Sequence, residues 1–107
     1  MTHKIGLAAQ AVAAADTEIV ARNPASGPAS IQGAEDGEAA LPGLFAEIDK
    51  AAGFDAIVIA CFDDTGLYAA RRRTRIPVVG IGEAAYHAAM LVAERFSVVT
   101  TLSVSIP

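Results

Sequence analysis

The residues with the clearest chemical potential lie in the segment AIVIACFDDTGL, residues 56–67. It ends an apolar run on Cys61, the only cysteine of the chain, and Asp63, Asp64 and Thr65 follow directly. A thiol between a strand and a helix can act as a base or a nucleophile, because the positive end of the helix favours a thiolate. Carboxylates this close oppose that effect. These residues alone therefore leave two readings open, a reactive thiol or a small buried apolar side chain.

The other candidate groups carry weaker signals. His87 is predicted on a helix, where Glu83 lies four residues earlier on the same face, which is typical of an exposed Glu–His pair. His3 is expected to be solvated, and we predict no metal site. The basic cluster RRRTR, residues 71–75, is typical of a solvated helix end rather than of a nucleic-acid site. GIGEAA, residues 80–85, lacks the full phosphate-loop pattern, but the helix it begins can offer backbone N–H groups to an anion.

Composition narrows the class of protein. The chain has 107 residues, 53% of them apolar and 6% aromatic, with a net charge of −4. This favours one globular domain and gives no support for binding to nucleic acid or to an anionic membrane. A single cysteine forms no internal disulfide, and we find no signal peptide and no apolar run long enough to span a membrane. We expect a cytoplasmic protein.

The apolar patterns predict alternating helices and strands. We expect helices over 2–15, 34–52 (interrupted or kinked at Pro42), 64–74 and 83–96, and strands over 17–23, 55–61, 77–81 and 97–102. This order predicts an α/β fold, a three-layer sandwich with a mainly parallel sheet flanked by helices.

Small or polar residues follow each predicted strand. Ligands of parallel sheets bind beyond the carboxyl ends of the strands. We therefore expect one edge of the sheet to gather a candidate site from Asn23, Cys61, Gly80–Gly82, Thr100 and Thr101.

Four segments together resemble a known family. They are NPASGPASIQG, AIVIACFDDTGL, PVVGIGEAA and FSVVTTLSVSIP. In combination they resemble the aspartate/glutamate/hydantoin racemase superfamily, and most of all its hydantoin and allantoin racemase branch. The resemblance covers essentially the whole chain.

The resemblance implies an isomerase that uses no cofactor and no metal. In such enzymes two α/β lobes face each other, and each supplies a cysteine that moves the α-proton. By position, Cys61 matches the catalytic cysteine of the first lobe. The matching substrate-binding positions are Phe62, Asp63, Gly82, Glu83, Thr100 and Thr101. The implied partner is a small molecule, a hydantoin, allantoin or an amino-acid derivative, and a homo-oligomer is an open alternative.

The chain also departs from the family pattern. The first strand with its Asn-Pro-Asn-Thr loop and the second lobe with its cysteine have no counterpart here. We therefore expect residues 1–107 to be a single partial α/β domain, an N-terminal lobe without its first strand and without the second lobe. Two alternatives stay open, a non-catalytic α/β fragment or small-molecule binding module, and a racemase of the aspartate/glutamate type.

Overall fold

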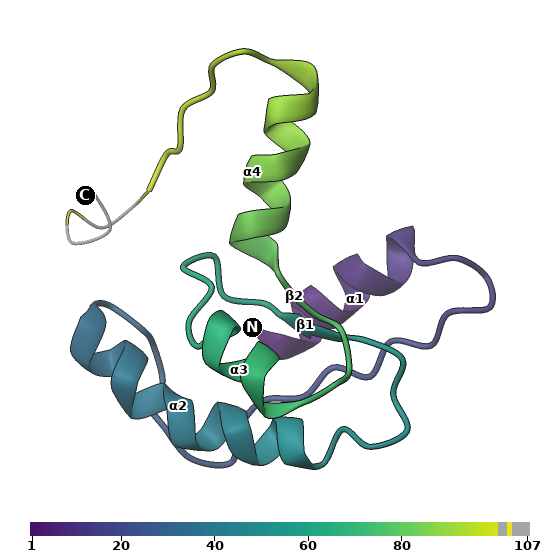
Figure 1. Ribbon diagram of the computed structural model, residues 1–107, viewed down its shortest axis with the longest axis vertical. Coiled ribbons are helices and arrows are strands. Elements are labelled where there is room, and N and C mark those ends of the chain that lie inside the picture. Colours follow the sequence, from purple (N-terminus) through teal and green to yellow (C-terminus); the bar gives the residue numbers. More distant parts are fainter. Residues whose placement is uncertain (101–102, 104–107) are drawn as a thin grey trace.

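The computed structural model describes residues 1–100 and 103. Its elements are α1 (Thr2–Val12), α2 (Ala34–Asp49), β1 (Ile57–Ile59), α3 (Leu67–Arg73), β2 (Val78–Gly80) and α4 (Ile81–Val92), as Figure 1 shows. The predicted α/β class is confirmed. Every predicted helix is present, although each is shorter than its apolar pattern or is shifted in its bounds.

The sheet in the described residues consists of two parallel strands. Ile57, Val58 and Ile59 of β1 pair with Val78, Val79 and Gly80 of β2. The chain turns from Gly80 directly into α4, so the ladder ends there, and both strands are shorter than the apolar runs that predicted them. The carboxyl ends of β1 and β2 therefore lie side by side.

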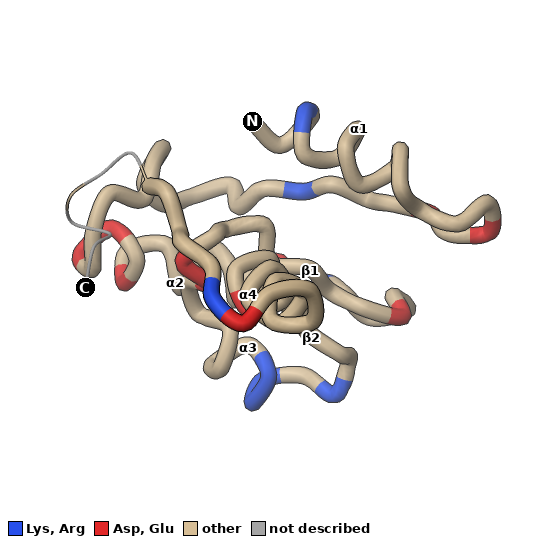
Figure 2. Tube along the Cα trace, turned by 90° about the horizontal axis from the view of Figure 1, so that it is seen from above, with Lys and Arg blue, Asp and Glu red and all other residues tan. Residues whose placement is uncertain are grey.

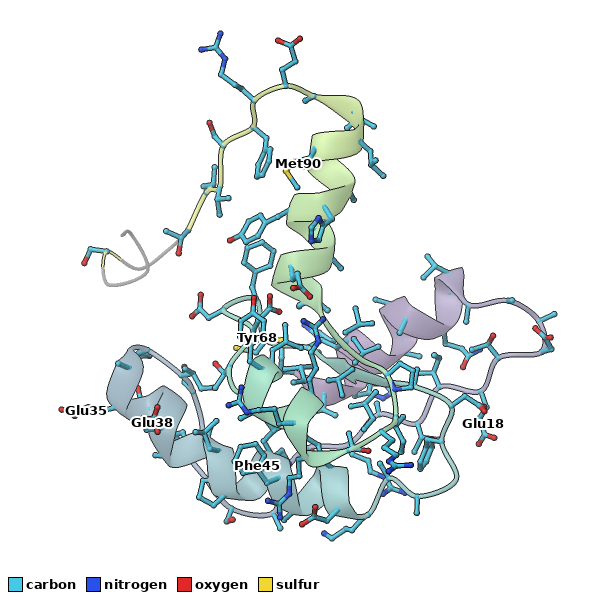
Figure 3. All side chains as sticks on the ribbon, in the orientation of Figure 1. Glu18, Glu35, Glu38, Phe45, Tyr68 and Met90 are labelled. Carbon is cyan, nitrogen blue, oxygen red and sulfur yellow. The ribbon has the colours of Figure 1, made fainter. Side chains whose placement is uncertain are left out.

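A small apolar core packs α2 and α3 against this sheet. Its buried side chains are Ile48, Ile59, Leu67, Ala70 and Val78, and Leu44, Phe45, Ile57 and Cys61 pack against them. Phe45 of α2 is labelled in Figure 3, where it lies below α3. The core therefore lies directly beneath the turn that carries Cys61.

Helix α2 continues through Pro42 as one element. The expected break into two helices is wrong, because α2 runs without interruption from Ala34 to Asp49, and the alternative, a kink at Pro42, stays a prediction. The buried Gly43 beside the proline lets the 24–27 loop approach closely, since a Cβ there would lie 2.5 Å from the Ser26 carbonyl oxygen. Packing against this loop favours a continuous helix despite the missing donor of Pro42.

The predicted strand 17–23 is wrong. The segment contains no strand, because it pairs with no neighbouring strand of the described residues, and it runs alongside α1 instead. Gly6 of α1 allows this approach, since a Cβ there would lie 2.9 Å from the Cβ of Ala21. The Gln10 amide also donates to the Thr17 carbonyl oxygen over 3.5 Å. Figure 2 shows α1 and this segment on one side of the sheet and α3 on the other.

Helix α4 projects from the rest of the fold (Figure 1). Its contacts with the body are concentrated at its first turn, next to β2, and Gly82 is its buried residue. The distal side chains Leu91 and Val92 are 87% and 86% exposed. Of the predicted strand 97–102, residues 97–100 form no strand, again for want of a pairing neighbour, and residues 101–102 lie outside the described residues.

Candidate functional site around Cys61

Cys61 lies two residues after Ile59, the last residue of β1, and is half-buried. One side of it packs against the core. Its Sγ atom lies 3.3 Å from the Thr65 hydroxyl oxygen, and either atom can be the donor of this hydrogen bond. The thiol is thus neither enclosed in the core nor freely solvated, and it has one defined polar partner.

The loop that carries the thiol, residues 61–66, is shaped by two successive turns. The Asp64 N–H donates to the Cys61 carbonyl oxygen over 3.0 Å, and the Leu67 N–H donates to the Asp64 carbonyl oxygen over 2.9 Å. Asp64 has a φ of 50°, and among the described residues it is the only non-glycine with a positive φ. Aspartate tolerates this left-handed conformation better than most residues do. Gly66, with a φ of 75°, is the N-cap residue of α3.

The side chain of Asp64 joins this loop to the β2–α4 turn. Its carboxylate accepts a hydrogen bond from the Gly82 N–H over 3.0 Å and another from the Glu83 N–H. Amides in the first turn of a helix have no partner within the helix, and an anion is favourable there. The sequence predicted that these N–H groups are available to a bound anion. In the structure they are occupied by Asp64.

Two glycines make this contact sterically feasible. A Cβ on Gly80 would collide with the Asp64 carboxylate, and a Cβ on Gly82 would collide with the Phe62 carbonyl oxygen. The Gly-Ile-Gly sequence is therefore explained by the close approach of loop 61–66 to α4, with no phosphate loop involved.

A second polar connection joins α3, β2 and α4. The Arg71 Nε donates to the Val78 carbonyl oxygen over 3.0 Å, and both terminal nitrogens of its guanidinium donate to the Glu83 carboxylate. The hydrogen bond from Arg71 is the largest influence on Glu83 and lowers the pKa of this carboxyl below its ordinary value. The side chain of Glu83 is thus committed to Arg71.

Aromatic rings line the surface beside the thiol. Phe62 meets Tyr86 of α4 edge to face with 5.6 Å between the ring centroids. Tyr86 in turn stacks on Phe96 at 5.9 Å. All three side chains are exposed, so loop 61–66, α4 and the segment after α4 share an open apolar surface next to Cys61.

The remaining predicted site residues are only partly brought together. Asp63 is exposed on loop 61–66, and Thr100 is exposed in the segment beyond α4. Thr101 lies outside the described residues. Cys61 follows β1 and Gly80 ends β2, so these two residues lie at the same edge of the sheet, as expected. Asn23 lies in the extended segment beside α1 and is not at the end of a paired strand.

His87 and the basic cluster, residues 71–75, lie outside loop 61–66. His87 is exposed on α4. Within the basic cluster, Arg71 pairs with Glu83, and Arg73 pairs with Asp49 across α2 and α3 with nitrogen–oxygen distances of 2.7 and 2.6 Å. Figure 2 shows the arginines of α3 along one side of the molecule. These ion pairs explain much of the cluster without a nucleic acid.

A shallow hollow lies between α1 and the extended segment. His3, Gly6 and Asn23 are among its lining residues, and none of that lining comes from loop 61–66 or α4. Residues 1–100 and 103 contain no group of three or more His, Cys, Asp or Glu side chains placed to hold a metal ion. No helix in the same part of the chain has the length and apolarity to cross a membrane.

Comparison with known proteins adds to this geometry. The family model described as Asp/Glu/Hydantoin racemase matches residues 1–107. This chain belongs to that family. Its half-buried thiol beyond a parallel strand is therefore the thiol of a racemase-family fold.

Individual members of the family are similar over most of this chain. A hydantoin racemase of Rhizobium meliloti is 52% identical over 95 residues, which are 87% of this chain and 39% of that protein. A hydantoin racemase of Pseudomonas sp. (strain NS671) is 50% identical over 104 residues, 95% of this chain and 42% of that protein. The solved structure of allantoin racemase from Klebsiella pneumoniae has a TM-score of 0.94 and 49% identity, covering 97% of this chain and 43% of its own. The chain thus spans about two fifths of the length of these racemases.

The sequence pointed to only one of the two aspartates of loop 61–66 as a site residue. The family resemblance assigned Asp63 as a substrate-binding residue, which stays a prediction, and the structure adds Asp64, whose carboxylate joins the loop to α4. The available signal was the Gly-Ile-Gly sequence after a strand, which indicates a close backbone approach. It did not identify the approaching group.

Proposed function

We propose that this chain supplies the Cys61 thiol to a racemase of 5-substituted hydantoins or related cyclic amides such as allantoin. The observation that supports this proposal most strongly is the position of Cys61, which is half-buried beyond a parallel strand and hydrogen-bonded to Thr65. The hydantoin and allantoin racemases that match most of the chain support this choice of substrate class.

The proposed reaction removes a proton from the stereogenic carbon on one face and adds a proton to the same carbon on the opposite face. A thiolate removes the hydrogen of the stereogenic carbon, and the electron pair delocalises onto the adjacent carbonyl as an enolate. A thiol on the opposite face then protonates that carbon, which inverts it. The thiol that gave its proton becomes the thiolate, so no net acid, base or redox equivalent is consumed. In this proposal the reaction requires no cofactor or metal.

Thr65 suits both protonation states of the sulfur. Its hydroxyl can donate to a Cys61 thiolate and accept from a Cys61 thiol across the same 3.3 Å. This partner fits a group that alternates between base and acid during turnover.

The second proton-transfer group in this proposal comes from outside these residues. Cys61 is the only cysteine of the 107 residues. Inversion needs groups on both faces of the carbon, and we propose that another polypeptide segment presents the second thiol opposite Cys61.

The proposed substrate contacts follow the exposed surface beside the thiol. Phe62 offers an apolar wall for the substituent of the ring, and Asp63, Thr100 and Thr101 are proposed to contact its polar atoms. Gly82 and Glu83 stay predicted substrate positions through their location at the start of α4. Their N–H groups are already used by Asp64, so the donors that stabilise the enolate oxygen must come from other residues.

A chimera tests this proposal directly. This chain would replace the matching segment of the Rhizobium meliloti hydantoin racemase, to which it is 52% identical. We expect the chimera to racemise a chiral 5-substituted hydantoin, followed by loss of optical rotation, in the presence of a chelator. Cys61→Ser in the chimera should lower kcat roughly 100-fold or more, because a positioned proton-transfer group contributes at least that much.

The control substitution is His87→Gln, which changes an exposed residue of α4 that the proposal does not use. It should leave kcat close to that of the chimera. A Cys61→Ser chimera with undiminished racemisation would overturn the proposal. A chimera that racemises aspartate or glutamate but no hydantoin would assign the chain to the other branch.

A further inference from the structure

Asp64 is the residue that connects the thiol loop to the rest of the sheet edge. Its carboxylate binds two amides of α4, the Gly82 and Glu83 N–H groups, across 18 and 19 residues of sequence. Helix α4 is preceded by Gly80 at its N-cap position, which has no side chain to cap it. The cap that most helices obtain from a neighbouring residue is supplied here by loop 61–66.

The backbone of Asp64 also contacts Cys61, while its side chain contacts α4. The turn bond from the Asp64 N–H to the Cys61 carbonyl fixes the distance between the two residues. The left-handed φ of 50° at Asp64 turns the chain so that its carboxylate reaches α4 while Thr65 reaches the Cys61 sulfur. Non-glycine residues hold such a conformation when the surrounding contacts fix it.

The glycines of the β2–α4 turn complete the same arrangement. Gly80 leaves room for the Asp64 carboxylate, and Gly82 leaves room for the Phe62 carbonyl. Three features of the sequence, the aspartate and the two glycines, thus serve one contact between Cys61's loop and α4.

We propose that Asp64 is a positioning residue, which holds Cys61 at the carboxyl edge of β1 by capping α4 from the neighbouring loop. It does not contact the substrate in this role. The inference rests on the proposed use of Cys61 in racemisation, because holding the thiol in place serves the reaction only if the thiol reacts.

Thiol alkylation of the 107-residue chain tests this role without any hydantoin. The chain has one cysteine, so the rate of modification by iodoacetamide, followed by mass spectrometry, reports on Cys61 alone. We expect Asp64→Ala to raise the alkylation rate severalfold, because the released loop takes the half-buried sulfur away from Thr65 and the core. Asp64→Asn keeps one acceptor oxygen for the amides of α4 and should give a smaller increase.

The matched control is Asp63→Asn. It removes the same charge from the same loop, but Asp63 is exposed, whereas the Asp64 carboxylate holds the α4 amides. Its alkylation rate should stay close to that of the unsubstituted chain. An equal increase in Asp63→Asn and Asp64→Asn would assign the effect to charge and would overturn the positioning role.

A second variant approaches the contact from the other side. Gly82→Ala places a methyl group against the Phe62 carbonyl and should also raise the rate. Because both changes break one contact, the double variant Asp64→Ala/Gly82→Ala should react no faster than the faster single variant. Additive increases would contradict the shared contact.

Far-ultraviolet circular dichroism of each variant shows whether it is folded. If Asp64→Ala does not fold, the comparison of Asp64→Asn with Asp63→Asn decides the question. Folded Asp64 variants that react at the unsubstituted rate would overturn the inference even if the chimera racemises hydantoin. Conversely, if the Asp64 variants are alkylated faster but the chimera is inactive, Asp64 still holds Cys61 in place and the proposed racemase function is wrong.

Discussion

Charged residues around Cys61 serve mainly to hold elements together. Arg71 bridges α3, the Val78 carbonyl of β2 and the Glu83 carboxylate of α4. The hydrogen bond from Arg71 lowers the pKa of Glu83 from its ordinary value of 4.5, and burial opposes this with a smaller effect. A carboxyl with a lowered pKa in the folded state stabilises the fold above its ordinary pKa, and that stabilisation is lost as the pH falls through the folded value.

Replacing this carboxylate should therefore weaken the fold in a pH-dependent way. We expect Glu83→Gln to lower the melting temperature at neutral pH, and the difference from the unsubstituted chain to shrink as the pH falls through the lowered pKa of Glu83, where this carboxyl becomes protonated. The pair is partly exposed, so the effect should be small and should weaken in salt. Thermal unfolding followed by circular dichroism measures it, with the exposed Glu94→Gln as control. A difference that is independent of pH would contradict the ion pair.

At the residue scale, the sequence predicted where Cys61 lies but not what holds it there. The apolar run before Cys61 places it at a strand end, because such runs form buried parallel strands. The role of Asp64 was not predictable, since its partners are amides of a distant helix and depend on how β1 and β2 pair. Local sequence patterns identify a cap that comes from the residue just before a helix. Asp64 instead caps α4 from a loop that lies 18 residues earlier in the sequence.

At the scale of elements, α2 combines an exposed proline with a continuous helix. Pro42 lies inside α2 and lacks the N–H that would bond to the preceding turn. Gly43 beside it is buried against Pro24 and Ser26, so the position next to the proline is fixed by packing. The proline is therefore a local weakness in an element that the core requires.

Pro42→Ala should stabilise the protein. Proline in a helix interior is about 3 kcal/mol less favourable than alanine, and its stiffness in the unfolded chain offsets up to about 1 kcal/mol of this, so a net gain of about 2–3 kcal/mol is expected. Urea unfolding at neutral pH measures the free energy. The exposed Ala46→Pro in the same helix should destabilise it instead. A loss of stability in Pro42→Ala would show that the proline ring makes a necessary contact.

Two of the predicted strands are wrong because an apolar pattern does not show whether a segment has a strand to pair with. Segments 17–23 and 97–100 have the composition of strands, but a strand exists only where a second strand pairs with it. The segment 17–23 instead lies along α1, where Gly6 admits Ala21. The β1 and β2 predictions succeeded because these two segments find each other in register.

At the scale of the whole molecule, the described fold is less compact than its length suggests. Its radius of gyration is 14.5 Å, against about 13 Å for a compact domain of this size. Helix α4 accounts for part of this difference, and Met90 near its end, labelled in Figure 3, lies far from the sheet. Cohesion therefore depends on the small core beneath loop 61–66.

Leu67 is central to that core. It is 2% exposed and packs at the start of α3, next to the Cys61 loop. Leu67→Ala should cost about 2–5 kcal/mol, a large share of the stability of a domain this small, whereas the exposed Tyr68→Ala should cost about 0.5 kcal/mol or less. Urea unfolding of both variants gives the comparison. Equal costs would contradict the position of the core.

The central claim is that Cys61 is one of two groups that act on opposite faces of the substrate. Racemisation by the chimera in deuterium oxide tests it most directly. If each face has its own thiol, the inverted hydantoin acquires deuterium at its stereogenic carbon while the unconverted enantiomer keeps its hydrogen. The Cys61→Ser chimera should then lose inversion in both directions. Early deuterium in both enantiomers, or inversion that survives Cys61→Ser, would contradict the account.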